Sequence, residues 1–160
     1  MARAVLLYDR DCGFCRAAAA AVLAWDRRRA LRPVAIQDPE ADLLLGGVAP
    51  ERRLDSWHLV LDPDADEEAP AAPRTDPNPG PRPLAAFSAG GAVAPLLRLL
   101  PGGAAPATVA ARLPRATERA YRLVAEHRSL LGRAVPSALR SRADALIGAR
   151  DGSGKRRNGR

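Results

Sequence analysis

The sequence predicts one α/β domain with a central mixed sheet of about four strands and helices on both faces of the sheet. Short apolar runs of strand length alternate with longer Ala- and Leu-rich runs of helical length. Apolar residues make up 47% of the 160 residues, which is enough to form a core, and Gly and Pro gather between the runs. The expected element order is βαβαββα, with extra helices towards the C-terminus.

The first three expected elements form a βαβ unit. Residues 4–8 predict a buried strand, residues 9–13 a loop, and residues 14–28 a helix. A second strand is expected over residues 31–36, where Pro33 favours a position at the edge of the sheet because proline cannot donate to a strand ladder. Two strands connected through a helix are expected to be parallel.

The middle of the chain is expected to hold one short helix and an antiparallel strand pair. Asp38 as N-cap and Pro39 at the first helical position are suited to start the helix. The strands are expected over residues 56–61 and 83–88. Residues 62–83, between these strands, contain seven prolines and an acidic cluster, so we expect them to form a disordered loop inserted in the domain.

The remaining apolar runs predict three further helices, the last of them amphipathic. They cover residues 89–100, 108–113 and 115–131. The complete order fits a thioredoxin-like three-layer fold. Its first strand-to-helix loop lies at the carboxyl end of a strand, where α/β proteins place their chemistry.

The predicted domain spans residues 1–135, followed by a short helix over residues 136–149 and a disordered basic tail over residues 150–160. The tail carries five basic residues and one acidic residue, but it has no aromatic residues for base stacking, so nucleic acid is not an expected partner. No apolar run approaches the ~20 residues of a membrane span, and no secretion signal is visible. We therefore expect a cytoplasmic protein.

Cys12 and Cys15 form a Cys-X-X-Cys pair at the expected helix start. Disulfide exchange needs an attacking thiolate and a second thiol that releases the mixed disulfide. The free N–H groups and the dipole at a helix start stabilise negative charge, so Cys12 is the expected nucleophile and Cys15 the expected resolving thiol. Gly13 allows a tight turn, and Phe14 is expected beside the site or in its docking surface.

The expected partners are a protein or small-molecule disulfide or thiol and an electron donor that the sequence does not identify. No cofactor besides the cysteine pair is expected. The carboxylates of Asp9 and Asp11 stand next to this pair, and two roles are open for them. One is to accept the proton of Cys15 in the resolving step. The other is to cap the helix and order the loop.

Three alternatives to a dithiol oxidoreductase remain open. A zinc site would need His58 and His127 as additional ligands, at spacings unlike those of a zinc finger. Asp9 and Asp11 after a strand are similar to the aspartate pair of haloacid-dehalogenase phosphatases, although the only lysine is Lys155 in the tail. The third alternative is a non-enzymatic binding or adaptor module that uses the acidic loop and the basic tail as contact elements.

The segment Tyr-Asp-Arg-Asp-Cys-Gly-Phe-Cys at residues 8–15 resembles the signature of the DCC family of predicted thiol–disulfide oxidoreductases. Residues 54–60, 87–93 and 121–133 resemble further segments of that family, so the resemblance covers residues 5–133. It implies a redox site formed by Asp11, Cys12 and Cys15, with Tyr8 and Asp9 beside it.

The sequence departs from thioredoxins at the segment that enters the third strand. Leu54, Asp55 and Ser56 stand where thioredoxins have a cis-proline opposite the redox pair. This difference argues against thioredoxin-style binding of an extended substrate. Asp55 or Ser56 is expected either to face the thiols or merely to open the strand. Arg128 is expected either to pair with a carboxylate of the loop or to be an exposed helical arginine.

Overall fold

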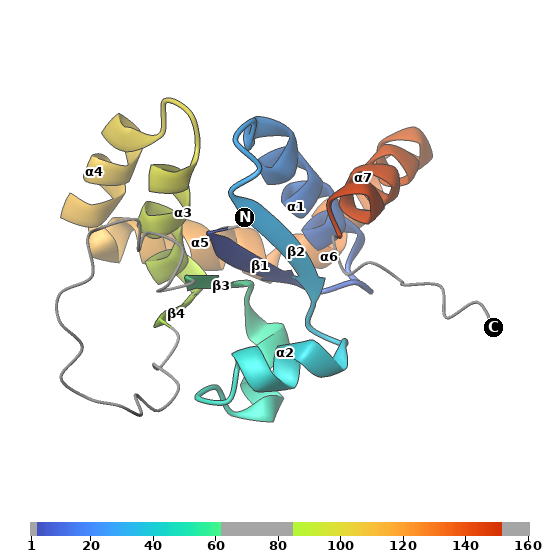
Figure 1. Cartoon of the computed structure of the whole chain (residues 1–160), viewed down its shortest axis with the longest axis horizontal. Helices are drawn as coiled ribbons and strands as arrows, with labels where there is room; N and C mark the ends of the chain where they lie inside the picture. Colours follow the sequence, from blue (N-terminus) through green and yellow to red (C-terminus); the bar gives the residue numbers. More distant parts are fainter. Residues whose placement is uncertain (1–2, 62–84, 152–160) are drawn as a thin grey trace, which may run out of the picture.

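A computed structural model of the chain describes residues 3–61 and 85–151. Its four strands form one sheet in the order β2-β1-β3-β4 (Figure 1). These strands are β1 (Ala4–Tyr8), β2 (Leu31–Ala35), β3 (His58–Leu61) and β4 (Ala85–Ser88). β1 pairs in parallel with β2, and β3 pairs antiparallel with both β1 and β4. The predicted mixed sheet and its parallel βαβ unit are confirmed.

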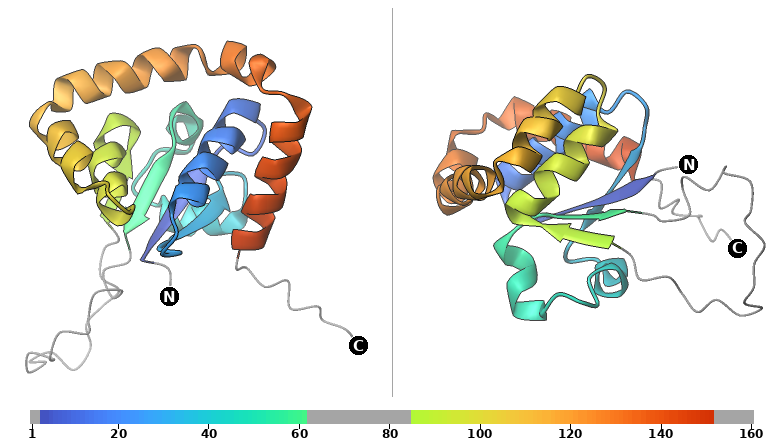
Figure 2. Two further views of the ribbon diagram at one scale, coloured as in Figure 1. Left: turned by 90° about the horizontal axis from the view of Figure 1, so that it is seen from above. Right: turned by 90° about the vertical axis from the view of Figure 1, so that its left-hand side faces the viewer.

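Helices cover both faces of this sheet, as the fold class requires. They are α1 (Gly13–Trp25), α2 (Pro39–Leu44), η1 (Pro50–Asp55), η2 (Ala89–Ala92), α3 (Val93–Leu99), α4 (Ala104–Arg112), α5 (Pro114–Glu126), α6 (Arg128–Ala134) and α7 (Ser137–Arg150). Figure 2 shows α1 and α3 on one face, α2 and η1 on the other, and α5 and α6 crossing the end of the sheet. The architecture is the predicted thioredoxin-like α/β arrangement with additional C-terminal helices.

The alternation of side chains along each strand divides the core into two parts. Leu6 and Leu59 belong to the cluster under α1 and α3, while Leu7 and Val60 belong to the cluster under α2. Neighbouring residues of a strand point to opposite faces of the sheet, so two successive leucines serve both layers. Pro33 lies in β2, which is an edge strand, as predicted.

Several predicted bounds were wrong, each for a local reason. The amphipathic helix expected over residues 115–131 is interrupted at His127, whose ring Nδ1 lies 2.8 Å from the Leu123 carbonyl oxygen, so it forms α5 and α6. Apolar periodicity does not reveal a one-residue break. The helix expected over residues 108–113 begins earlier, at Ala104, because Pro106 lies in the first turn, where proline is tolerated.

Two more expected elements start later or differently in the structure. The helix expected over residues 89–100 begins with the 3-10 turn η2 before α3. The strand expected over residues 56–61 starts only at His58, because the preceding Trp57 N–H donates to the Tyr121 hydroxyl, 3.0 Å away. The segment before β3 is therefore tied to α5 instead of extending the sheet.

Arg150 was expected in a disordered tail, and this prediction was wrong. It is the last residue of α7, and its guanidinium lies 3.0 Å from the carboxylate of Asp26, which is 0% exposed. Arg150 also donates to the carbonyl oxygens of Leu23 and Asp26. The Asp26 carboxylate accepts the N–H groups of Ala30 and Leu31 as well. A buried ionic contact thus fastens α7 to the end of α1.

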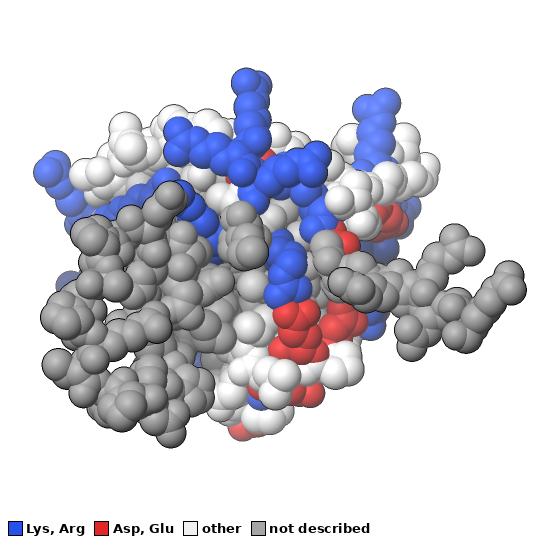
Figure 3. All heavy atoms as spheres, viewed as in Figure 1, with Lys and Arg blue, Asp and Glu red and all other residues white. Residues whose placement is uncertain are grey.

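Ion pairs fix α2 against the sheet and the first loop. Asp38 occupies the predicted N-cap position, but its carboxylate makes no capping hydrogen bond and instead accepts from Arg10 at 2.8 Å. Glu40 pairs with Arg32 of β2, and this cation lowers the pKa of the glutamate. Figure 3 shows acidic side chains grouped near α2, while basic side chains gather higher on the same face.

No helix in the two described ranges is long and apolar enough to cross a membrane. The predicted acidic loop over residues 62–83 and the tail from residue 152 lie outside the described residues.

Candidate functional site

The loop between β1 and α1 is held by hydrogen bonds of Asp9 and Gln37. The Asp9 carboxylate accepts the N–H of Asp11 at 2.9 Å and the side-chain amide of Gln37 at 2.7 Å. The side-chain oxygen of Gln37, Oε1, in turn accepts the backbone N–H of Arg10 at 3.1 Å. Because Gln37 follows β2, the loop that carries the cysteines is fixed to the neighbouring strand. The hydrogen bonds of Asp9 thus order this loop.

Cys12 itself is the N-cap residue of α1. Its sulfur accepts the backbone N–H of Cys15 at 3.2 Å and the Cys15 thiol at 2.6 Å. Both cysteines are half-buried and free. The expectation that Asp9 or Asp11 caps the helix was therefore wrong, because a cysteine sulfur takes the place of the usual capping oxygen.

Burial raises the pKa of the Cys15 thiol to about 12. The hydrogen bond to Cys12 and the negative charges of Cys12 and Asp9 act in the same direction, while Arg128 opposes them. Burial and nearby negative charge favour the protonated thiol, whereas the positive charge of Arg128 favours the thiolate. Cys15 thus keeps its proton at neutral pH and donates it towards Cys12.

Asp9, not Asp11, is the carboxylate beside the two thiols. A carboxylate oxygen of Asp9 and the sulfur atoms of Cys12 and Cys15 all lie within 4.8 Å of one another. Asp11 is exposed, and its carboxylate lies 3.3 Å from the amide nitrogen of Gln37. One oxygen and two sulfur donors could together hold a thiophilic ion such as Zn²⁺.

Neither histidine joins these three donors. The ring of His58 is buried in the sheet, where its nitrogens lie 2.7 Å from Ser88 Oγ and 2.8 Å from the Arg53 carbonyl oxygen. Burial lowers the pKa of this histidine. His127 stands at the break between α5 and α6. The arrangement is thus not the Cys₂His₂ set considered from the sequence.

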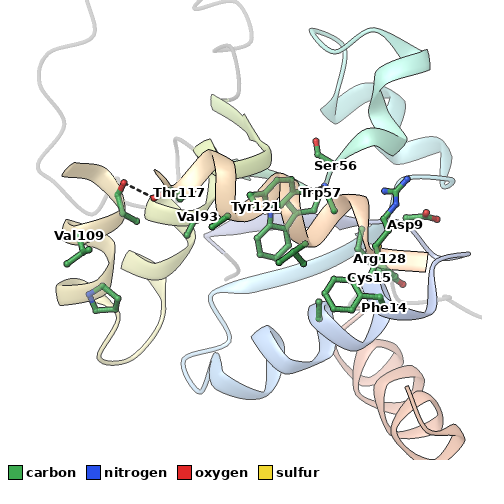
Figure 4. A pocket seen from close by; sticks show the side chains of 17 residues that line it. Asp9, Phe14, Cys15, Ser56, Trp57, Val93, Val109, Thr117, Tyr121 and Arg128 are labelled. Atoms are coloured by element: carbon green, nitrogen blue, oxygen red, sulfur yellow. Dashed lines mark hydrogen bonds between the residues drawn. The ribbon is translucent and has the colours of Figure 1, made fainter. Parts of the chain in front are cut away.

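An apolar cavity of about 610 Å³ lies beside Cys15 (Figure 4). It is lined by Tyr8, Asp9, Phe14, Cys15, Ala18, Ser56, Trp57, Val93, Pro106, Val109, Ala110, Thr117, Ala120, Tyr121, Val124, Ala125 and Arg128. Tyr8, Phe14 and Ser56 were expected to line the site, and they do line this cavity. Gly13 instead begins α1 and faces Gly132 of α6.

Asp55 was also expected at the site, but it lines a neighbouring cavity, which shares Ser56, Tyr121, Ala125 and Arg128 with the apolar cavity. Asp55 ends η1, and the next residue has extended backbone angles, φ −151° and ψ 166°. Ser56 lines both cavities, whereas Asp55 lines only the neighbouring one. No peptide bond between described residues is cis, consistent with the absence of proline before β3.

Trp57 and Tyr121 form the aromatic floor of the apolar cavity. Their rings stack with centroids 6.2 Å apart and planes inclined by 23°. The Tyr121 hydroxyl accepts the Trp57 backbone N–H, and the Trp57 indole N–H donates to the Ala89 carbonyl oxygen at 3.3 Å. Burial raises the pKa of Tyr121. The sequence had not assigned either aromatic residue to the site.

Arg128 is a third cavity residue that the sequence did not assign to the site. It is half-buried instead of exposed, and it donates to the Leu54 carbonyl oxygen at 2.8 Å, not to a carboxylate of the loop. Gly132, one turn further on, lets α6 approach α1, because a Cβ there would lie only 3.2 Å from the Phe14 nitrogen. Gly132 thus lies against the start of α1, while Arg128 and Tyr121 line the cavity beside it.

The fold and the cysteine pair together define a thioredoxin-like protein with a dithiol at a strand-to-helix turn. The family model for DCC1-like thiol-disulfide oxidoreductases matches residues 6–134, and the chain belongs to this family. No curated protein and no solved structure matches the chain. The family and the adjacent cysteines support a function in thiol–disulfide chemistry.

Proposed function

We propose that this protein is a thiol–disulfide oxidoreductase in which Cys12 attacks the substrate and Cys15 resolves the mixed disulfide. The observation that carries the proposal is the asymmetry of the pair. Cys12 Sγ accepts two hydrogen bonds at the start of α1, whereas the pKa of Cys15 is raised to about 12. Hydrogen bonds and the helix dipole favour negative charge on Cys12.

The proposed reaction has two exchange steps. The Cys12 thiolate attacks one sulfur of a disulfide RSSR, so that a Cys12–S–S–R bond forms and RS⁻ leaves. Cys15 then loses its proton and attacks the Cys12 sulfur, which releases the second RS⁻ and leaves a Cys12–Cys15 disulfide. With the two sulfur atoms 2.6 Å apart, this bond forms with little movement of the backbone. An external thiol donor restores the dithiol.

Asp9 is the proposed acceptor of the Cys15 proton in the second step. Its carboxylate lies within 4.8 Å of both sulfur atoms, a separation that a small rotation or one bridging water closes. Its hydrogen bonds to Gln37 and the loop hold it in this position. The same carboxylate raises the pKa of Cys15, so the proton leaves only when the thiol is about to attack.

A single-turnover experiment tests the function. Reduced protein is mixed with bis(2-hydroxyethyl) disulfide, and the released 2-mercaptoethanol is followed with time. We expect about two thiols per protein in two phases, since one thiol leaves in each exchange step. The protein is expected to end as the internal disulfide by mass spectrometry. Release of no thiol, or of one thiol with a persistent adduct, would contradict the proposal.

Replacing Asp9 with asparagine is expected to slow the second phase on the order of 100-fold at pH 7, because a proton acceptor is lost. The direction of the rate change distinguishes a proton-accepting Asp9 from one that acts only through its charge. Without the negative charge, the pKa of Cys15 falls, so a purely electrostatic Asp9 would predict a faster second phase in the variant. The deficit should shrink as the pH rises, because hydroxide then removes the proton.

The matched control is Asp11→Asn, which removes the neighbouring exposed carboxylate that contacts the same Gln37. Its second phase is expected to stay within about twofold of wild type. Equal slowing by both substitutions would show that loop order, and not the Asp9 carboxylate, controls the step.

A further inference from the structure

We infer that the redox pair acts on small apolar disulfides or thiols, whose hydrocarbon groups occupy the apolar cavity beside Cys15. This inference rests on the proposed function and adds the class of substrate. The volume of about 610 Å³ lies within the range of about 300–1,000 Å³ found for small-molecule sites.

The cavity is elongated, and its two ends differ in chemistry. In Figure 4, Cys15, Asp9 and Arg128 lie at one end, Trp57 and Tyr121 in the middle, and Val93 towards the other end. The charged residues therefore gather at the end where sulfur chemistry would take place. The remaining length offers mainly aliphatic and aromatic surface, which favours hydrocarbon.

Several polar groups along this length already make hydrogen bonds within the protein. The Thr117 hydroxyl donates to the Ala110 carbonyl oxygen at 3.2 Å. The Tyr121 hydroxyl accepts from the Trp57 backbone, and the Trp57 indole N–H donates to Ala89. A ligand with polar groups beside these residues would regain few of the hydrogen bonds it loses to water, which costs free energy.

The backbone beside the cavity also argues against an extended peptide as substrate. Extended peptides add to a sheet edge through free N–H and C=O groups. Here both groups of Trp57 are used, since its N–H donates to the Tyr121 hydroxyl and its C=O accepts the N–H of Ala89 at 3.3 Å. Trp57 is therefore not open to pairing with a peptide, and the apolar walls offer the larger surface for recognising a substrate.

Arg128 fits the chemistry expected at the cysteine end. Attack on a disulfide places negative charge on the departing sulfur, and a cation beside it stabilises this charge. Arg128 lines the cavity together with Cys15 and opposes the rise in the Cys15 pKa. Cys12 does not line the cavity itself, but its Sγ lies 2.6 Å from Cys15 Sγ, so the attacking sulfur lies just beyond this end of the cavity.

Two disulfides of nearly equal size test the inference. Bis(2-hydroxyethyl) disulfide and dipropyl disulfide differ only in a hydroxyl or a methyl group at each end. The rate of the first thiol release is measured for both and divided by the rate with dithiothreitol, which corrects for intrinsic reactivity. We expect the wild-type protein to prefer dipropyl disulfide about tenfold or more. The sulfur-free alcohol 1-octanol is expected to compete with it.

The variant Ala120→Trp fills the apolar cavity from α5, and it is expected to reduce this preference to near one. Ala116→Trp on the same helix does not line the cavity and serves as the matched control with an unchanged preference. Should both disulfides react with no preference and no competition by 1-octanol, the substrate class is wrong while the proposed function stands. Should neither disulfide react, both proposals fail.

Discussion

Cys12→Ser is expected to abolish thiol release from bis(2-hydroxyethyl) disulfide, with a rate at least about a thousandfold below wild type at pH 8. Cys15 is not expected to replace the nucleophile, because burial, the largest cause of its raised pKa, persists when Cys12 is replaced. Cys15→Ser is expected to release one thiol and then stop as a stable mixed disulfide on Cys12. Thiol release and intact mass measure both outcomes.

The two cysteine variants control for each other, since each keeps one half-buried sulfur at the start of α1. Glutathione added to the Cys15→Ser adduct should free Cys12 again, which shows that the trapped species is a disulfide. If Cys15→Ser blocks the first phase and Cys12→Ser forms the adduct, the two roles are reversed.

Arg150→Ala is expected to lower the free energy of unfolding by about 3–5 kcal/mol, because it leaves the carboxylate of Asp26 buried without its cation. The hydrogen bonds to the Leu23 and Asp26 carbonyl oxygens are lost as well. Urea denaturation followed by circular dichroism measures the change.

Two further variants identify the cause of that loss. Arg142→Ala removes an exposed arginine from the same helix and is expected to change the unfolding free energy by less than about 0.5 kcal/mol. Adding Asp26→Asn to Arg150→Ala is expected to restore part of the stability, because the buried group is then neutral. A double variant that is less stable than Arg150→Ala would show that the hydrogen bonds of Asp26 to Ala30 and Leu31 outweigh the cost of its unpaired charge.

The sheet was predictable because its strands carry their own signals. The apolar run of β1 and the proline of β2 indicate a buried strand and an edge strand without knowledge of any partner. Contacts between distant residues carry no such signal. Arg150 and Asp26 are 124 positions apart, and an arginine among many arginines gives no hint of its partner.

The candidate site likewise contains residues that the sequence predicts and residues that only the fold brings together. Cys12 and Cys15 are four residues from end to end, so one helical turn places them together and the sequence suffices. The choice of Asp9 over Asp11 depends on Gln37, which only the fold brings to the loop. Tyr121 reaches the cavity from α5, where the hydrophobic pattern equally suits an ordinary core position.

The attachment of α7 to α1 has a consequence for the order of events during synthesis. The cysteine-bearing helix is complete by Trp25, whereas its contacts with α7 and the ion pair of Asp26 require residues up to Arg150. At about 5–20 residues per second, the ribosome needs roughly 6–25 s to make the intervening chain. The packing of α1 against α7 is therefore completed only after Arg150 has been made.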